Sequence, residues 1–466
     1  MSWRRVRASL WGSVLRRLLP SARFAVLSLA ALPACGTGFG SQRPNVLLVV
    51  IDTLRADHVG ASGYGLPTTP ELDALTERGT YFEQAIASSS WTRPSMAALL
   101  TGHHPESVGL TCHNFRIPEA DCDVLPRSAI TLAEHLGPAG WETAGVVANI
   151  NVDPVFGFHQ GFDRYVSIAE LLAGSEGEDW RQNDTWLDRT TRRTTDEALA
   201  WLDEREGREP FFLYLHYLDP HAPHDPPQEH AQAFSSADYD ADADTAALLA
   251  RYDAEIQYVD RQLARVLERL EDEGELEHTI IIVTSDHGEE FGDHGGREHG
   301  WTLYEEQLRV PLTIAIPELE SPPRIEEQVC LIDVVPTICE VLELRPPADL
   351  PGRSLLPLLR GARQAVPSAL SGWGYKPLTS FRAPPWKLIH NDATGDTQLF
   401  HLEDDPGEKV DVSEQHPDIV AVLRVQLEQT RRKAVDLRAS FPPDSATPEL
   451  SESQRDALGA IGYTED

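Results

Sequence analysis

Lysine is scarce in this 466-residue chain, and positive charge is scarce with it. The lysines are Lys376, Lys387, Lys409 and Lys433, so residues 1–375 contain none. Asp and Glu outnumber Lys and Arg by 74 to 40, which gives a formal net charge of -34. A surface of this sign repels polyanions. We therefore expect no nucleic-acid partner and no electrostatic binding to an anionic membrane.

Cysteine is also sparse, with five in the whole chain, and none lies in a spacing typical of a structural zinc site. Cys112 and Cys122 bracket a polar segment and can pair as a disulfide if the protein is exported. Cys330 and Cys339 lie in an apolar stretch, where buried free thiols are an equal alternative to a disulfide.

Long apolar runs are missing after the N-terminus, so the sequence predicts no membrane-spanning helix. Residues 1–35 combine an arginine-rich stretch with a short apolar run over 24–34, a pattern typical of a signal peptide. The segment 32–36 (Leu-Pro-Ala-Cys-Gly) resembles a bacterial lipoprotein box with Cys35 as the lipidated residue; an ordinary secretory signal or an uncleaved anchor are the alternatives. We expect an exported protein of the bacterial cell envelope, lipid-anchored or periplasmic, with that anchor as its only membrane contact.

Hydrophobic residues make up 41% of the chain, which is enough for a large core. From Pro44 onward, apolar runs alternate with helical patterns. The runs that predict buried strands are 45–51, 143–149, 211–217 and 279–284. Their alternation with helices is typical of an α/β fold whose mainly parallel sheet is sandwiched between helices.

The pattern changes after Gly361, where short strand patterns precede a helix predicted from about Pro417 to Val435. This order predicts a small antiparallel α+β subdomain. We expect a catalytic domain over residues 44–361, a C-terminal subdomain over 362–438 and a tail over 439–466.

Acidic side chains follow two of the predicted strands. Asp52 ends the first run, and Asp286 and His287 follow the run 279–284. In open α/β sheets, ligands bind in the crevice outside the carboxyl ends of the strands. Either Asp alone is consistent with a turn or helix-capping residue. Together, the two carboxylates and the imidazole predict a site for a divalent metal ion.

Thr92 precedes a helix predicted to begin near Pro94, where threonine is a common N-cap. The alternative is a nucleophilic hydroxyl, which requires activation near neutral pH, for example by a metal ion. The start of the helix would also attract a phosphate or sulfate ester.

A series of motifs resembles the sulfatase family of the alkaline phosphatase superfamily, in the family's order. Residues 44–52 resemble its N-terminal metal-binding strand, and 92–102 (Thr-x-Pro-Ser-Met-x-x-x-Leu-Thr-Gly) is similar to the sulfatase motif Cys(or Ser)-x-Pro-Ser-Arg-x-x-x-Leu-Thr-Gly. Further matches lie at 219–223, 285–288, 304–311, 333–337, 386–388 and 399–408. The resemblance implies an alkaline-phosphatase-like fold and hydrolysis of sulfate or phosphate esters.

Several departures from the family pattern concern the site itself. Thr92 stands where sulfatases carry the cysteine that becomes formylglycine, Met96 replaces the motif arginine, and Thr53 replaces a second aspartate. The two sulfate-holding lysines have no counterpart in residues 1–375, and residues 145–151 lack the usual Lys-x-His. A threonine nucleophile resembles nucleotide pyrophosphatases/phosphodiesterases and phosphoglycerol or phosphoethanolamine transferases. The resemblance therefore favours phosphoester chemistry through a covalent intermediate on Thr92.

The resemblance also assigns roles to individual residues. One divalent ion (Ca²⁺, Mn²⁺ or Zn²⁺) is expected on Asp52, Thr92, Asp286 and His287. His221 would contact the substrate or protonate the leaving group, and His299 and Asn114 would hold the nonbridging oxygens. The expected partner is a small-molecule, glycan or lipid ester. An envelope phospho-head-group transferase and a non-catalytic sulfatase-like binding protein are the alternatives.

Overall fold

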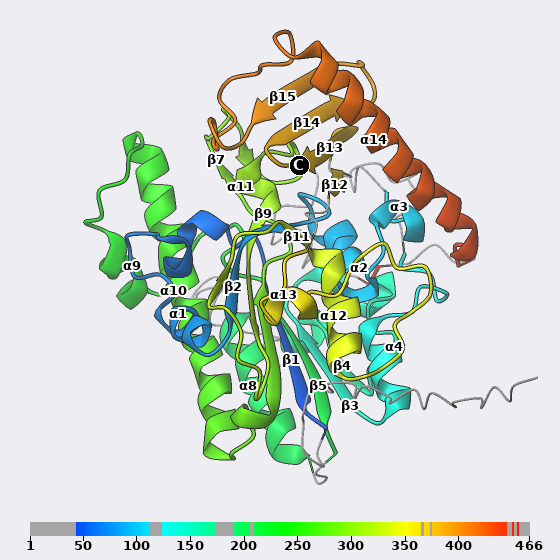
Figure 1. Cartoon of the computed structure of the whole chain (residues 1–466). Helices are drawn as coiled ribbons and strands as arrows, with labels where there is room; N and C mark the ends of the chain where they lie inside the picture. Colours follow the sequence, from blue (N-terminus) through cyan, green and yellow to red (C-terminus); the bar gives the residue numbers. More distant parts are fainter. Residues whose placement is uncertain are drawn as a thin grey trace, which may run out of the picture. The chain divides into compact units, whose positions relative to one another are not determined.

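The strands of the computed structural model form a nine-stranded central sheet within its described residues, with helices on both faces (Figure 1). The structure describes residues 43–111, 124–172, 190–205, 209–364, 368–372, 375–444, 450–451 and 454–455. The strand order is β10-β2-β9-β6-β1-β5-β3-β4, with β11 also paired to β2.

Parallel strands run from the middle of this sheet to its β4 edge. They are β6 (Thr279–Thr284), β1 (Asn45–Ile51), β5 (Phe211–Tyr217), β3 (Glu142–Val147) and β4 (Arg164–Val166). β9 (Arg309–Ala315) runs antiparallel to both β6 and β2 (Thr80–Ile86), and β10 (Arg324–Ile325) and β11 (Val329–Cys330) extend the β2 edge. The mainly parallel α/β sheet predicted from the sequence is confirmed.

The strand β1 is buried along its whole length because both faces of the sheet are covered. Val46, Leu48 and Val50 point into one core, which is covered by α2 (Thr92–Thr101), α4 (Leu132–Leu136), α12 (Val334–Val341) and α13 (Leu356–Leu359). The alternate residues of β1 point into a second core, beneath α1 (Pro70–Glu77), α8 (Thr191–Glu204) and α10 (Ala243–Asp272). Two-sided burial explains why the strand reads as one continuous apolar run.

A second, four-stranded antiparallel sheet follows in the order β12-β13-β14-β15. Its strands are β12 (Ala369–Gly372), β13 (Leu378–Ala383), β14 (Trp386–Asn391) and β15 (Thr397–His401). The helix α14 (Pro417–Leu437) lies along this sheet in Figure 1, and its Leu423 and Leu427 pack on Phe381 and Leu388. The predicted C-terminal antiparallel α+β unit is confirmed, and its helix is two residues longer than expected.

Shorter elements complete the described part of the chain. They are α3 (Pro105–Val108), α5 (Ile168–Leu172), α9 (Gln228–Phe234), β7 (Glu290–Phe291), β8 (Arg297–Glu298) and α11 (Glu305–Leu308). None of the helices that the structure describes combines the length and apolarity needed to cross a bilayer. Cys330 and Cys339 are buried free thiols.

Three predictions fall on residues outside the described ranges: the N-terminal segment 1–35, the pairing of Cys112 with Cys122, and the role of Asn114. They stay predictions. Two further predicted boundaries differ from the structure by two residues. The strand predicted over 143–149 ends at Val147, and the helix predicted near Pro94 begins at Thr92.

Candidate active site

The carboxyl ends of three adjacent parallel strands meet at the candidate site. Asp52 directly follows β1 and Asp286 lies two residues beyond β6, which pairs with β1. On the other side of β1, β5 carries His216, paired in register with Val50. The helix α2 begins at Thr92 beside this edge. Asp52, Thr92, His216 and Asp286 are all completely buried.

Thr92 lies within hydrogen-bond distance of His287. The distance from Thr92 Oγ1 to His287 Nε2 is 3.2 Å. His287 Nδ1 lies 2.9 Å from the carbonyl oxygen of Gly288, so Nδ1–H donates there and Nε2 faces Thr92. Trp91, not Thr92, occupies the N-cap position of α2, so the interpretation of Thr92 as a helix cap was wrong.

Three side chains at this edge can hold a metal ion. Ligand atoms of Asp52, His216 and Asp286 all lie within 4.8 Å of one another. Oδ1 of Asp52 and Oδ2 of Asp286 accept no hydrogen bond from any residue that the structure describes. Buried carboxylate oxygens without partners are costly unless a cation compensates them. Two carboxylates and an imidazole therefore fit a divalent ion such as Ca²⁺, Mn²⁺ or Zn²⁺.

The electrostatics of the two carboxylates agree with that fit. Burial, together with the nearby Asp52 carboxylate, raises the pKa of Asp286. Burial also acts to raise the pKa of Asp52, but the hydrogen bond from His216 and the neighbouring histidines outweigh it and hold that pKa well below its usual range. Two like charges at this separation repel, and a bound cation removes the repulsion.

His287 joins this group from the same loop as Asp286. Its Nε2 lies 3.3 Å from Oδ2 of Asp286 and 3.7 Å from Oδ1 of Asp52. The structure therefore brings all four predicted metal residues to one place, and their joint coordination of an ion stays a prediction.

Two residues of the site were missed by the sequence analysis. His216 Nε2 lies 3.2 Å from Oδ2 of Asp52, and Asn149 Nδ2 donates to that same oxygen and lies 3.5 Å from Thr92 Oγ1. His216 is the polar residue near the end of an otherwise apolar strand, which was a usable signal. Asn149 was assigned to a strand; it lies beyond the strand's end, where its Oδ1 accepts a hydrogen bond from the backbone of Asn151.

The backbone after Asp52 is strained. Thr53, a β-branched residue, has φ of 55°, a conformation that such residues rarely adopt. The hydroxyl of Tyr252 donates to the carbonyl oxygen of Thr53 at 2.7 Å and holds this turn. Strain of this kind, about 1–3 kcal/mol, persists where surrounding contacts enforce it and is frequent at functional sites.

Two further histidines line the same place. The ring of His299 lies 4.4 Å from that of His287 and 4.9 Å from that of His221, measured between centroids. Glu289 Oε1 lies 3.2 Å from His299 Nδ1 and so fixes the orientation of that ring. Burial and the neighbouring His299 lower the pKa of His221 to about 4, and burial and His287 lower that of His299 well below its usual value. Both rings are therefore neutral near pH 7.

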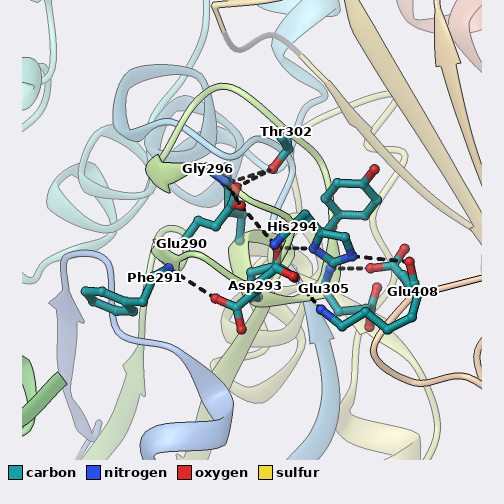
Figure 2. Close-up of polar contacts among 12 residues, drawn as sticks. Glu290, Phe291, Asp293, His294, Gly296, Thr302, Glu305 and Glu408 are labelled. Carbon is teal, nitrogen blue, oxygen red and sulfur yellow. Dashed lines mark hydrogen bonds and ion pairs between the residues drawn. The ribbon is translucent and has the colours of Figure 1, made fainter. Parts of the chain in front are cut away.

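A polar network holds the loop that carries His299 (Figure 2). Glu290 Oε1 accepts from the backbone N–H of His294 at 3.0 Å and from that of Gly296 at 2.7 Å. His294 Nδ1 lies 2.7 Å from Oε1 of Glu306, and its Nε2 lies 3.2 Å from the carbonyl oxygen of Glu408. The loop is thus fixed both internally and to the segment that follows the second sheet.

Comparison with known proteins agrees with this arrangement. The sequence model of the family described as Sulfatase matches residues 44–344, and that of "N-sulphoglucosamine sulphohydrolase, C-terminal" matches residues 292–433. The arylsulfatase of Clostridium perfringens is 25% identical over 457 residues, which cover 82% of this chain and 93% of that protein.

Several solved structures share the fold, and two of them illustrate the match. One, determined with its substrate D-glucosamine-2-N,6-O-disulfate, has a TM-score of 0.72 and 21% identity, and the match covers 85% of this chain and 99% of that one. The phosphonate monoester hydrolase of Agrobacterium radiobacter has a TM-score of 0.67 and 22% identity over 88% of this chain and 98% of that one. At this identity the likeness establishes the alkaline-phosphatase-like fold alone.

The fold and the family match together define a hydrolase that acts on sulfate or phosphate esters. The chain belongs to the sulfatase family. Enzymes of this family are metal-dependent, and the ligand-competent group of Asp52, His216 and Asp286 agrees with that property.

Proposed function

We propose that this enzyme hydrolyses phosphate esters through a covalent intermediate on Thr92, and that it acts on sulfate esters less efficiently. One observation carries the proposal: the buried Thr92 hydroxyl lies at the N-terminus of α2, 3.2 Å from His287 Nε2 and beside the carboxylates of Asp52 and Asp286. A nucleophile needs such a neighbourhood, because a free alkoxide is inaccessible near neutral pH.

In the first step, Thr92 Oγ1 forms a bond to phosphorus and the bond to the leaving alcohol breaks. Water then hydrolyses the phosphothreonine, which releases phosphate and restores the hydroxyl. The net proton transfer in the first step runs from Thr92 to the departing alkoxide. His221, whose ring lies 4.9 Å from that of His299 beside the site, is the residue that would pass a proton to the departing oxygen.

The chain's own residues divide the remaining work. The amino end of α2 faces the transferring group and favours its negative charge. Asn149 donates toward both Asp52 and Thr92 and so fixes the position of the nucleophile. A divalent ion held by Asp52, Asp286, His216 or His287 would lower the pKa of the Thr92 hydroxyl and offset charge on the phosphoryl oxygens.

Sequence and packing both favour phosphate over sulfate. Thr92 cannot become formylglycine, and Met96, which replaces the motif arginine, is completely buried in the apolar core instead of lining the site. Among the solved structures with this fold are two phosphonate monoester hydrolases, whose substrates carry a P–O ester bond.

A side-by-side assay tests the proposal. The purified protein, supplied with Mn²⁺, Zn²⁺ or Ca²⁺, is given an aryl sulfate, a phosphate monoester, a phosphate diester and a phosphonate ester. We expect the phosphorus esters to turn over faster than the aryl sulfate, and Thr92→Ala to abolish turnover. Mass spectrometry of quenched reactions should find added phosphate on the peptide that contains Thr92.

The matched control is Thr101→Ala, because Thr101 is equally buried at the other end of the same helix. Its activity should stay near that of the unchanged protein. Undiminished turnover by Thr92→Ala would remove Thr92 from the mechanism. A faster aryl sulfatase reaction would reverse the substrate preference.

We also propose that the enzyme is exported and held at the bacterial cell envelope through a lipid on Cys35, because residues 32–36 resemble a lipoprotein box. Full-length protein expressed in a bacterium should partition with membranes, and the Cys35→Ser variant should not mature to the lipidated form. Equal partitioning of the two variants would contradict the anchor.

A further inference from the structure

Three aromatic rings form a row that begins next to the nucleophile. Trp91 directly precedes Thr92, and its side chain is almost completely buried. The ring centroid of Tyr375 lies 6.1 Å from that of Trp91 and 4.8 Å from that of Trp301. Trp301 is 38% exposed, so the row leads from the buried threonine to the protein surface.

The exposed end of the row also adjoins the site. Trp301 lies two residues after His299, whose ring is 4.4 Å from that of His287. The loop that carries both residues is held by Glu290 and Glu289. Both ends of the row therefore belong to segments of the site, because Trp91 precedes Thr92 and Trp301 lies two residues from His299.

The middle of the row is built for close packing. The backbone N–H of Tyr375 donates to the carbonyl oxygen of Gly300 at 2.5 Å. Gly300 has φ of 80°, and a Cβ at this position would lie 2.7 Å from Cδ2 of Tyr375. Only glycine fits both the backbone conformation and the ring that covers it. The segments that carry Gly300 and Tyr375 are thus in close contact, and the Tyr375 ring lies against Trp301.

Exposure of this side chain is unusual for the protein. Among the described residues, the other large hydrophobic side chains with substantial exposure are aliphatic: Ile130, Val410, Val422, Val425 and Val435. A tryptophan face offers a large, rigid apolar surface, and it binds flat rings by stacking. An exposed indole supported by a second ring, next to a site that cleaves esters, has the features of a binding surface for a leaving group.

We propose that Trp301, backed by Tyr375, is the leaving-group subsite, and that the enzyme's substrates are esters of a ring-bearing alcohol. An aryl ring and the apolar face of a pyranose present the same flat, apolar surface. This inference rests on the proposed ester hydrolysis at Thr92 and specifies the kind of alcohol that the ester contains.

Phosphate monoesters that differ only in the leaving alcohol test the proposal. The ring substrates are phenyl phosphate and a methyl glucoside 6-phosphate, and the reference is n-butyl phosphate. Comparing each variant with the unchanged protein cancels the intrinsic reactivity of each leaving group. Trp301→Ala should lower kcat/KM about three- to tenfold for at least one ring substrate, mainly through KM, and less than about twofold for butyl phosphate.

Trp301→Phe should restore most of the loss, because a flat ring remains. Val422→Ala, which removes an exposed apolar side chain from α14, should leave kcat/KM unchanged for both the ring substrates and butyl phosphate. A loss confined to phenyl phosphate identifies an aryl leaving group, and a loss confined to the glucoside identifies a sugar. An equal loss for ring and butyl substrates, or no loss, overturns the proposal.

A binding measurement separates this proposal from that of the nucleophile. Calorimetry on Thr92→Ala measures the Kd of phenyl phosphate and of the glucoside phosphate without turnover. We expect Trp301→Ala in that background to raise one of these Kd values about three- to tenfold and to leave the Kd of butyl phosphate unchanged. If Thr92→Ala stays active while the selectivity of Trp301→Ala holds, the nucleophile assignment fails and the subsite stands. Undetectable or unaltered binding of both ring ligands overturns the subsite.

Discussion

Lys387 is the residue whose replacement should most clearly weaken the junction between the two sheets. It lies on β14 and is completely buried. Its Nζ lies 3.0 Å from Oε1 of Glu305 and 2.9 Å from Oε1 of Glu408. Burial acts to lower the pKa of Lys387, but the two carboxylates outweigh it and raise that pKa above its ordinary value. The ammonium is therefore charged and paired.

Lys387→Met leaves one of the two carboxylates without a cation. Glu305 keeps Arg382, whose Nη2 lies 3.1 Å from its Oε2. Glu408 has no other ion-pair partner among the residues that the structure describes. Removal of one partner from a buried ion pair costs about 3–5 kcal/mol. We expect about 3 kcal/mol, the lower end, because Glu305 stays paired and Glu408 can take up a proton.

Urea unfolding followed by tryptophan fluorescence measures this loss, with Lys433→Met on the exposed side of α14 as the control. The double variant Lys387→Met with Glu408→Gln should recover most of the stability, because the unpaired charge is gone. A loss below about 1 kcal/mol in the single variant, or a double variant no more stable than the single one, would refute the account of a paired buried charge.

Three further outcomes are expected. His216→Ala should weaken divalent-ion binding about tenfold or more, measured as metal retained after dialysis; full retention would exclude His216 as a ligand. Burial raises the pKa of Glu106 to about 7 despite its ion pair with Arg431. Its protonated form therefore stabilises the fold by up to about 3 kcal/mol below about pH 4.5, and this contribution is lost as the pH rises through 7. Glu106→Gln should flatten this decline in urea midpoints between pH 5 and 8, and an unchanged slope would contradict it. Asp260→Ala should lower the free energy of unfolding by about 1–2 kcal/mol, because the Asp260 carboxylate accepts hydrogen bonds from the Glu71 and Leu72 N–H groups at the start of α1. A thermal unfolding curve identical to that of the unmodified protein would rule this out.

The amino-acid pattern was enough to predict the architecture and most of the site. Continuous apolar runs such as 45–51 reveal strands buried on both faces, because no polar residue interrupts them. Asp52, Asp286 and Thr92 were found because each lies where an element begins or ends, and strand ends of a parallel sheet meet at one edge. Motif order along the chain then identified the family, which the match over residues 44–344 confirms.

Tertiary structure alone decided which other residues reach that edge. His216 stands out in the sequence as a polar residue of an apolar strand, but only the pairing of β5 with β1 places it beside Asp52. Asn149 depended on a strand end that the sequence placed two residues too late. The row from Trp91 to Trp301 joins three segments that no local pattern relates. Sequence patterns report the environment of each residue within one element, whereas strand pairing and packing set distances between elements, and a site depends on those distances.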